Sequence, residues 1–262
     1  MNVSFYKYQG TGNDFIIFDN RALFFPKSNN LLISNLCNRH FGIGADGLIL
    51  LENDENSNFK MIYYNADGNE STMCGNGGRC IVAFAKKLQL FDKKTKFSAI
   101  DGMHYAEIND NKVSLQMINV NDIKVFGNSV FTNTGSPHHI EVVDNLEDFP
   151  VVIKGRQIIN KHYQTEGCNV NFVEKLNNET FKVRTYERGV EDETLACGTC
   201  VTAVAIAMHF NKKSLSNRIK LIVLGGSLEV QFKEHKGDYT DIILSGPATF
   251  VFEGKIALSW WF

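Results

Sequence analysis

Long apolar runs, an excess of charge of one sign and an apolar leader are all missing from this sequence. No stretch reaches the roughly 18 uninterrupted apolar residues of a membrane span, and the opening residues, MNVSFYKYQGTGNDF, lack a basic start followed by an apolar block. Lys and Arg number 27 and Asp and Glu 29, a net charge of −2. Because nucleic-acid binding rests largely on positive charge, we expect no nucleic-acid partner. We also expect no membrane partner and place the protein in a reducing cytoplasm.

The cysteines lack the pattern of a disulfide framework or a zinc site. In a reducing compartment the six cysteines are buried fillers or reactive thiols. The segment Cys197-Gly198-Thr199-Cys200 has the C-x-x-C spacing of redox and zinc sites, but no second close pair or H-x-x-x-H completes four ligands. We therefore expect no metal. A chain of 262 residues, 44% of them apolar, also needs no crosslink to bury a core.

One glycine pattern has the spacing of a nucleotide-binding loop without its setting. Residues 42–47, GIGADG, match G-x-G-x-x-G. That loop binds a pyrophosphate only when a strand precedes the glycines and a helix follows them. Here the predicted helix comes first and the strand second, so the pattern does not indicate a nucleotide site.

The chain contains an internal repeat with a constant offset of 123 positions. Residues 63–75 (YYNADGNESTMCG) correspond to residues 186–198 (YERGVEDETLACG), so Cys74 aligns with Cys197. The same offset relates Thr11-Gly12 to Thr134-Gly135 and Gly102 to Gly225. One offset across loops, apolar runs and cysteines indicates a duplicated unit. The predicted domains are residues 1–126, joined by a C-terminal return of residues 250–262, and residues 127–249.

Each unit is predicted to be rich in strands around one dominant helix. Short apolar runs bounded by turn residues indicate buried strands at residues 15–18, 48–51, 151–153 and 219–224. Residues 31–41 have the spacing of a small amphipathic helix, whereas residues 79–88 and 199–210 are apolar almost all round, as a buried helix is. The predicted fold class is α+β: two pseudo-symmetric domains, each a mostly antiparallel sheet wrapped around a central buried helix.

Cys74 and Cys197 carry the chemical hypothesis. Each stands at the start of a predicted buried helix, where free N–H groups and the helix dipole favour negative charge. A helix end contributes about 0.3–2 kcal/mol, and lowering a thiol pKa by one unit takes about 1.4 kcal/mol. Cys200 corresponds to Gly77 in the first copy, so the repeat retains a single cysteine and Cys200 is interpreted as a filler.

Two equivalent acid/base groups suit the removal of a proton from one face of a carbon and its return to the other. That reaction is racemisation or epimerisation, and it requires one sulfur to be a thiolate while the other stays a thiol. Glycines at the two helix starts, Gly75, Gly77, Gly78 and Gly198, let backbone N–H groups approach a substrate carboxylate. The alternative from the residues alone is a pair of inert core cysteines.

Motifs along the whole chain resemble the diaminopimelate epimerase family, whose members use two cysteines and no pyridoxal cofactor. The resemblance rests on these segments: residues 10–15 (GTGNDF), 39–47 (RHFGIGADG), 65–68 (NADG), 73–79 (MCGNGGR), 135–138 (GSPH), 169–172 (NVNF), 186–189 (YERG) and 196–199 (ACGT). The block CGNGGR is the most specific of them. The resemblance implies conversion of LL-2,6-diaminopimelate to the meso form, on the route to lysine and cell-wall peptide.

The resemblance also implies roles for individual residues. Cys74 and Cys197 would be the catalytic acid and base, and His138 and Glu187 would tune their pKa values. The implied substrate-binding residues are Asn13, Asn65, Gly75, Asn76, Asn169, Glu187, Arg188, Gly198 and Thr199, with Ser136 and Gly47 as weaker candidates. No cofactor is implied, the partner is the small-molecule substrate, and a homodimer is the candidate assembly. Without the resemblance, His138 is equally a solvated turn histidine, Glu187-Arg188 an exposed charge pair, and Arg39 and Arg79 structural residues.

The sequence departs from the family pattern at four positions. Family members often carry Gln at Gly47, Ser at Asn69, Asn at Ser136 and Gly at Cys200. A shorter or absent side chain at 47 and 136 is expected to loosen the hold on one end of the substrate. Two alternative functions therefore stay open: a racemase of another amino acid on the same two-thiol scaffold, and a thiol redox or anion-binding protein using Cys197 and Cys200.

Overall fold

The computed structural model describes residues 2–164 and 166–258 and divides the chain into two compact units. The first unit comprises the described residues up to Leu115 together with those from Pro247 onward, and the second runs from Gln116 to Gly246. The sequence-based boundary at 126/127 stays a prediction. Of the predicted C-terminal return, residues 259–262 lie outside the described part of the chain.

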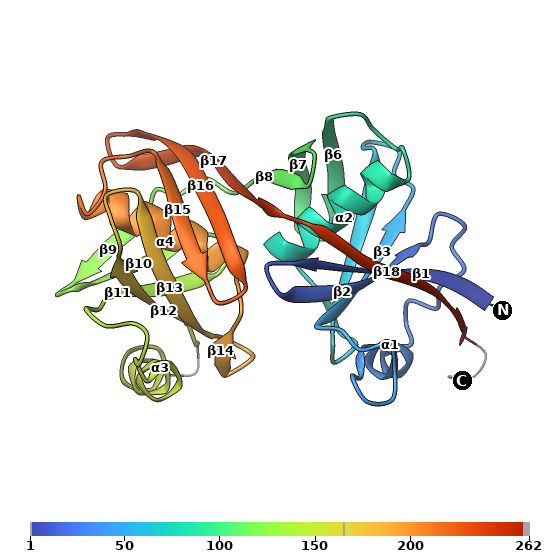
Figure 1. Ribbon diagram of the computed structural model, residues 1–262, viewed down its shortest axis with the longest axis horizontal. Coiled ribbons are helices and arrows are strands. Elements are labelled where there is room, and N and C mark those ends of the chain that lie inside the picture. Colours follow the sequence, from blue (N-terminus) through green and yellow to red (C-terminus); the bar gives the residue numbers. More distant parts are fainter. Residues whose placement is uncertain (1, 165, 259–262) are drawn as a thin grey trace. The chain divides into compact units, whose positions relative to one another are not determined.

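Eight strands of the first unit pair side by side, and a short strand flanks them. In pairing order they are β18 (Thr249–Ala257), β1 (Asn2–Gly10), β2 (Asn13–Asp19), β3 (Gly47–Glu52), β4 (Phe59–Asn65), β6 (Lys94–Ala99), β7 (Gly102–Asn109) and β8 (Lys112–Gln116), with β5 (Glu70–Ser71) beside β4. The pairs β2–β3 and β4–β6 are parallel and the others antiparallel. The final strand β18 thus completes the sheet of the unit in which the chain begins, and Figure 1 shows it running along β1.

The second unit repeats this pairing order. Its strands are β9 (Ile123–Phe126), β10 (Ser129–Asn133), β11 (Pro137–Val142), β12 (Asn169–Lys175), β13 (Thr180–Glu187), β15 (Arg218–Val223), β16 (Gly226–His235) and β17 (Asp238–Pro247), with β14 (Asp192–Thr194) beside β13. Here too the two parallel pairs, β11–β12 and β13–β15, stand at equivalent places among antiparallel ones. The prediction of two mostly antiparallel α+β units is confirmed.

One long helix occupies the centre of each unit. These helices, α2 (Gly75–Lys87) and α4 (Gly198–Phe210), stand 123 positions apart and lie against the inner side of their own strands (Figure 1). Ten of the thirteen residues of each are buried, which explains why their apolar residues are not confined to one stripe. Helix α2 begins at Gly75, before the predicted residue 79. Three of the four residues that precede Arg79 are glycines, which are poor helix formers, so composition did not indicate the earlier start.

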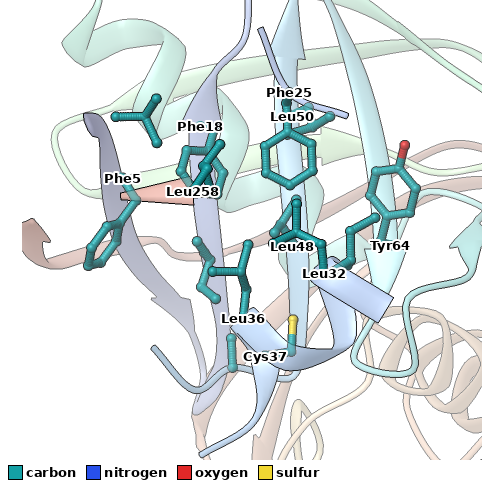
Figure 2. Packing of buried hydrophobic residues seen from close by; sticks show 14 of the residues in the cluster. Phe5, Phe18, Phe25, Leu32, Leu36, Cys37, Leu48, Leu50, Tyr64 and Leu258 are labelled. Carbon is teal, nitrogen blue, oxygen red and sulfur yellow. The ribbon is translucent and has the colours of Figure 1, made fainter. Parts of the chain in front are cut away.

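A smaller helix covers the opposite side of the first sheet. In α1 (Asn30–Cys37) the side chain of Asn29 caps the helix by accepting a hydrogen bond from Leu32 N at 2.9 Å. Figure 2 shows Leu32 and Leu36 facing side chains of β2 and β3, including Leu48. The helix ends at Cys37, short of the predicted residue 41, because Asn38 adopts an extended backbone conformation.

The strand predicted at residues 151–153 is wrong. These residues begin helix α3 (Val151–Ile158), which continues as a π-helical turn, η1 (Ile159–Tyr163). Val151, Gly155 and Ile159 are buried at a spacing of four, which is the period of a helix and not of a strand. The sequence pointed to a strand because residues 151–153 are three β-branched residues after Pro150, a run too short to show the helical period.

Every helix in the described ranges is too short or too polar to cross a lipid bilayer.

Candidate active site

Cys74 stands at the start of the central helix of the first unit. It is the N-cap residue of α2, with an extended backbone, and its half-buried side chain places Sγ 3.6 Å from Asn13 Oδ1. The residues that follow, Gly75 and Asn76, form the first turn and lie at the positive end of the helix dipole. A negative charge at this sulfur is therefore favoured by the helix end.

A chain of side-chain amides fixes the polar groups beside Cys74. Asn76 Nδ2 donates to Asn13 Oδ1 at 3.1 Å, and Asn13 Nδ2 donates to Asp46 Oδ2 at 2.7 Å. Behind them, Arg79 donates to Asn76 Oδ1 at 3.0 Å. Because each amide has a donor on one side and an acceptor on the other, both orientations are determined by the network. Asn13, Cys74 and Asn76, all predicted site residues, are thus brought together.

A cluster of charged residues supports the Asn13 end of this chain. Asp14 forms ion pairs with Lys7 at 2.6 Å and Arg39 at 2.6 Å, and Arg39 also pairs with Asp46 at 2.7 Å. Burial raises the pKa of Asp14, but hydrogen bonds from Arg39 and Lys7 outweigh it and hold that pKa at about 2. Asp14 is therefore ionised at neutral pH. Arg39, for which the sequence left a structural role open, is part of this network.

Asn65 and Gly47 lie opposite one another on neighbouring strands. Their backbones pair in the β3–β4 register, and the side chain of Asn65 is exposed. Among the described residues no hydrogen bond joins that side chain to Asn13, Cys74 or Asn76. Gly47 is buried, and a Cβ there would lie 2.6 Å from the ring of Tyr63, which explains why this chain has no side chain at that position.

Cys197 stands at the equivalent helix start of the second unit. It is the N-cap of α4, and its half-buried Sγ accepts a hydrogen bond from Cys200 N at 3.4 Å and lies 3.3 Å from Thr199 Oγ1. Thr134 Oγ1 donates to Thr199 O at 2.8 Å and holds this turn in place. The sulfur thus contacts backbone and side-chain groups of the first helical turn.

His138 is buried and not solvated, so the interpretation as a solvated turn histidine is wrong. It belongs to β11, its exposed fraction is 0%, and neither ring nitrogen has a hydrogen-bond partner among the described residues. Burial, joined by the positive charge of Arg188, lowers the pKa of His138 to about 3. The imidazole is therefore neutral at physiological pH.

The other predicted residues of the second unit lie at the ends of β12 and β13. Asn169 Oδ1 accepts a hydrogen bond from Arg188 N at 3.0 Å, and Asn169 Nδ2 donates to Pro137 O at 3.4 Å. The carboxylate of Glu187 accepts from Thr194 Oγ1 at 2.6 Å. The exposed guanidinium of Arg188 donates to Glu166 O at 3.3 Å.

Ser136, a weaker candidate, is half-buried beside these residues. Its carbonyl oxygen accepts a hydrogen bond from Thr134 N at 3.1 Å and closes the turn before β11. This contact uses the backbone of Ser136, so it does not depend on which side chain stands at position 136.

The remaining four cysteines differ from Cys74 and Cys197 because all are buried. Burial raises the pKa of Cys37, Cys80 and Cys168 to about 12. The pKa of Cys200 is raised well above its ordinary value by burial and by its hydrogen bond with Cys197. These thiols stay protonated at neutral pH, so the interpretation of Cys200 as a buried filler fits its position.

Three residues near the two helix starts were not singled out from sequence: Asp46, Thr11 and Thr134. Thr11 Oγ1 accepts from Arg79 Nη2 at 3.2 Å in the first unit, and Thr134 contacts Thr199 in the second. The available signal was the repeat, because Thr-Gly occurs at both positions with the 123 offset. Asp46 has no such signal, since position 169 is an asparagine.

Known proteins match the chain along its whole length. The family model described as "Diaminopimelate epimerase" matches residues 5–121 and 130–251. A diaminopimelate epimerase of Flavobacterium psychrophilum is 58% identical over 253 residues, which cover 96% of this chain and 99% of the relative. One of Aquifex aeolicus is 39% identical over 277 residues, covering 97% and 98%.

Solved structures share the fold at much lower identity. A PhzF-family phenazine biosynthesis protein of Bacillus anthracis matches with a TM-score of 0.76 at 13% identity, covering 98% of this chain and 99% of that one. A hydroxyproline epimerase from Agrobacterium vitis matches with a TM-score of 0.70 at 12% identity, covering 98% and 93%. At such identities the likeness concerns the fold alone.

Proposed function

Because the chain belongs to the diaminopimelate epimerase family, we propose that it converts LL-2,6-diaminopimelate to the meso form by a two-base mechanism that needs no cofactor. Cys74 and Cys197 are the acid/base pair. One sulfur, as thiolate, removes the α-hydrogen from one face of the carbon, and the other, as thiol, delivers a proton to the opposite face. The enzyme is an isomerase that acts on a small molecule.

The observation that carries this proposal is the different burial of the cysteines. Cys74 and Cys197 are half-buried N-cap residues of the central helices, and the other four cysteines are buried. A buried thiol with a raised pKa keeps its proton near pH 7. Cys74 and Cys197 instead stand half-buried at helix starts, where the helix dipole favours a negatively charged group. The two cysteines that the repeat aligns are therefore the two that suit acid/base chemistry.

The helix starts also suit the substrate carboxylate. As the α-proton leaves, negative charge develops on that carboxylate, and preorganised N–H donors stabilise it. We assign this role to the turns Gly75-Asn76 and Gly198-Thr199, which begin α2 and α4 and so lie at the positive ends of the two helix dipoles. No side chain at Gly75 or Gly198 obstructs the approach of an anion.

The remaining residues hold polar groups of the substrate. Asn13, held by Asn76 and Asp46, and the exposed Asn65 serve from the first unit. In the second unit Glu187 suits an ammonium group and the Arg188 guanidinium a carboxylate. Asn169 acts by holding the Arg188 backbone, since both ends of its amide are engaged.

His138 and Glu187 act on the second helix start through different charges. His138 is neutral, so it influences the site as an uncharged dipole and not as a cation. Glu187 is a carboxylate whose charge contributes to the raised pKa of Cys200, the next cysteine along α4. A carboxylate near a helix start opposes the formation of a thiolate there.

The setting of the reaction follows from its chemistry. Two thiols that exchange protons must remain free of disulfides, which suits a reducing cytoplasm. A homodimer remains a proposed assembly. Gly47 and Ser136 are assigned no direct contact with the substrate, because Gly47 has no side chain and the Ser136 contact uses its backbone.

Proton exchange in deuterated water tests the proposal. Purified protein with LL-diaminopimelate should incorporate solvent deuterium at Cα while forming the meso isomer, as followed by NMR and mass spectrometry. Cys74→Ala and Cys197→Ala should each abolish epimerisation. Full activity in either variant, or no deuterium incorporation by the unaltered protein, rejects the mechanism.

Cys200→Ser is the matched control. This buried cysteine lies one helical turn from Cys197, so its replacement destroys a dithiol couple but leaves both proposed acid/base groups. Retained epimerisation separates the proposal from a redox function. Turnover of single-centre amino acids at a rate equal to that of diaminopimelate would favour the alternative of a racemase with another substrate.

A further inference from the structure

Two thiols lie in contact at the start of helix α4. Cys197 is the N-cap residue and Cys200 stands in the first turn, where its backbone N–H donates to Cys197 Sγ at 3.4 Å. The side chain of Cys200 also forms a hydrogen bond with that of Cys197. An N-cap side chain meets the residue three positions farther on in the same way in a capping box. The turn therefore holds the two sulfur atoms beside each other.

The two thiols differ in their access to solvent and in their charge. Cys197 is half-buried, whereas the exposed fraction of Cys200 is 0%. The helix dipole favours negative charge at the N-cap, while burial and the bond to Cys197 raise the pKa of Cys200 well above its ordinary value. Oxidants react with an accessible thiolate and poorly with a buried thiol. A soluble oxidant is therefore expected to attack Cys197 first and to leave Cys200 intact.

Neighbouring threonines fix the turn that carries the pair. Thr134 Oγ1 donates to Thr199 O at 2.8 Å, and Thr202 Oγ1 donates to Gly198 O at 2.9 Å. Thr199 Oγ1 also lies 3.3 Å from Cys197 Sγ. Because the folded turn is already ordered, joining the two sulfur atoms costs little additional backbone entropy.

The equivalent turn of the first unit carries a single thiol. The repeat aligns Cys74 with Cys197, but it aligns Gly77 with Cys200. Cys74 Sγ lies 3.6 Å from Asn13 Oδ1, and the next cysteine of α2, Cys80, is buried beyond the first turn. The two copies of the turn thus provide an internal comparison, one with a second thiol and one without it.

We propose that Cys197 and Cys200 form a redox modification site, at which a peroxide oxidises Cys197 and Cys200 converts the product to a disulfide within the turn. The Cys197 thiolate attacks one peroxide oxygen, so that the S–O bond forms, the O–O bond breaks and hydroxide leaves. The sulfur is oxidised to a sulfenic acid and the peroxide is reduced. The Cys200 sulfur then attacks this sulfenic acid: the S–S bond forms, the S–O bond breaks, and hydroxide leaves with the Cys200 proton as water.

This inference rests on the proposed function for its consequence. While the disulfide persists, Cys197 can neither take nor give a proton, so epimerisation stops until a dithiol reduces the bond. The disulfide also keeps Cys197 from becoming a sulfinic acid, which thiols do not reduce. Cys74 lacks this protection because position 77 is a glycine. In a reducing compartment such a disulfide is transient, as redox-sensing disulfides are.

Peptide mapping of the unaltered protein provides the first test. The protein is treated with hydrogen peroxide, quenched in acid, alkylated and digested with trypsin, which releases residues 189–212 with Cys197 and Cys200 as their only cysteines. This peptide should lack the mass of two hydrogen atoms and should regain it with dithiothreitol. Any sulfinic acid that forms should lie at Cys74. Sulfinic acid as the main product at Cys197, or a disulfide from Cys197 to a cysteine other than Cys200, overturns the assignment.

Two variants provide the second test. Cys200→Ala removes the partner thiol, so sulfinic acid should replace the disulfide as the main product at Cys197. Cys37→Ala, the matched control, removes another buried thiol, from α1, and should leave the disulfide unchanged. Both reduced variants should epimerise like the unaltered protein. Equal amounts of sulfinic acid at Cys197 with and without Cys200 contradict the inference. If Cys200→Ala does not fold, the maps of the unaltered protein and Cys37→Ala decide.

The disulfide and the epimerase mechanism are read by different measurements. At a peroxide dose that leaves Cys74 unmodified, the lost fraction of activity should equal the disulfide fraction, and dithiothreitol should restore both. A protein that incorporates deuterium but forms no bond between Cys197 and Cys200 loses only the modification site. A protein that forms the bond but incorporates no deuterium keeps the site and loses the epimerase mechanism.

Discussion

Asp46 holds the side-chain amide of Asn13 in a single orientation. Asp46 Oδ2 accepts from Asn13 Nδ2 at 2.7 Å, so Asn13 Oδ1 faces the other way and accepts from Asn76 at 3.1 Å. A carboxylate can only accept here, which excludes the flipped amide. Asp46 therefore determines which atoms of the Asn13 amide lie beside Cys74, although Asp46 itself contacts Asn13 and not the sulfur.

Asp46→Ala is expected to raise the KM for LL-diaminopimelate roughly tenfold, since a hydrogen bond to a charged group contributes about 1.5–3 kcal/mol. The Asn13 amide would lose its orientation while Cys74 and Cys197 keep their positions, so kcat should fall less than KM rises. Steady-state kinetics measure both. The control is Arg39→Met, which removes the ion pairs of Arg39 with Asp46 and with Asp14 but keeps the hydrogen bond between Asp46 and Asn13. An equal rise in KM in both variants would attribute the effect to charge instead of amide orientation.

His138 should make the folded protein less stable in acid. Its pKa is about 3 in the folded state, below the ordinary value of 6.5, so the unfolded chain binds a proton that the folded chain refuses between these values. This contribution is absent above pH 6.5 and grows as the pH falls toward 3, by up to about 1.4 kcal/mol per pH unit. Urea unfolding between pH 7 and pH 4 should show a shallower fall for His138→Phe than for the unaltered protein.

The comparison must allow for a neighbouring histidine. His139 also has a pKa lowered, to about 4, chiefly by burial, so His138→Phe should remove only part of the pH dependence. His139→Gln provides the matched variant, and the two changes should add because each removes one proton. Identical slopes for His138→Phe and the unaltered protein would mean that His138 is accessible to water in solution.

The central helices and their cysteines could be predicted because two independent signals agreed. Helix α4 is apolar around its circumference, and the repeat placed Cys197 and Cys74 at the same point of each copy. Local composition predicted the buried helix, and the offset of the repeat indicated that Cys74 and Cys197 are the functional cysteines. Neither signal depends on the tertiary arrangement, so both are readable from the chain.

Helix α3 was misread although the repeat contained the correction. Residues 31–41 were predicted helical, and the same offset of 123 places their counterparts at 154–164, within and after α3. Periodicity over Val151–Ile153 alone is too short to separate a strand from a helix. The physical signal was the burial period of four from Val151 to Ile159, which needs the longer window.

The side-chain network could not be predicted from sequence. Three separate elements supply its members: β2 carries Asn13, the turn before β3 carries Asp46, and α2 carries Asn76. They meet only because β2 and β3 pair in parallel at one register. A shift of one residue in that register would turn the side chains to the other face of the sheet. The resemblance to the family therefore identified Asn13 and Asn76 as site residues. The role of Asp46 and the orientation of the amides became visible only in the folded structure.

Gly47→Ala is expected to destabilise the protein by about 1–3 kcal/mol, the usual cost of an overpacked core. The added Cβ would lie 2.6 Å from Tyr63 Cε2 and 2.7 Å from Tyr64 O, and this backbone oxygen cannot withdraw without disturbing the β3–β4 pairing. The control is Gly77→Ala, whose Cβ would meet only side-chain carbons at 3.3–3.5 Å and which favours the helix by up to about 1 kcal/mol. Urea unfolding should place Gly47→Ala well below Gly77→Ala. Equal stability of the two would mean that the Tyr63 ring and the neighbouring strand yield freely to a methyl group.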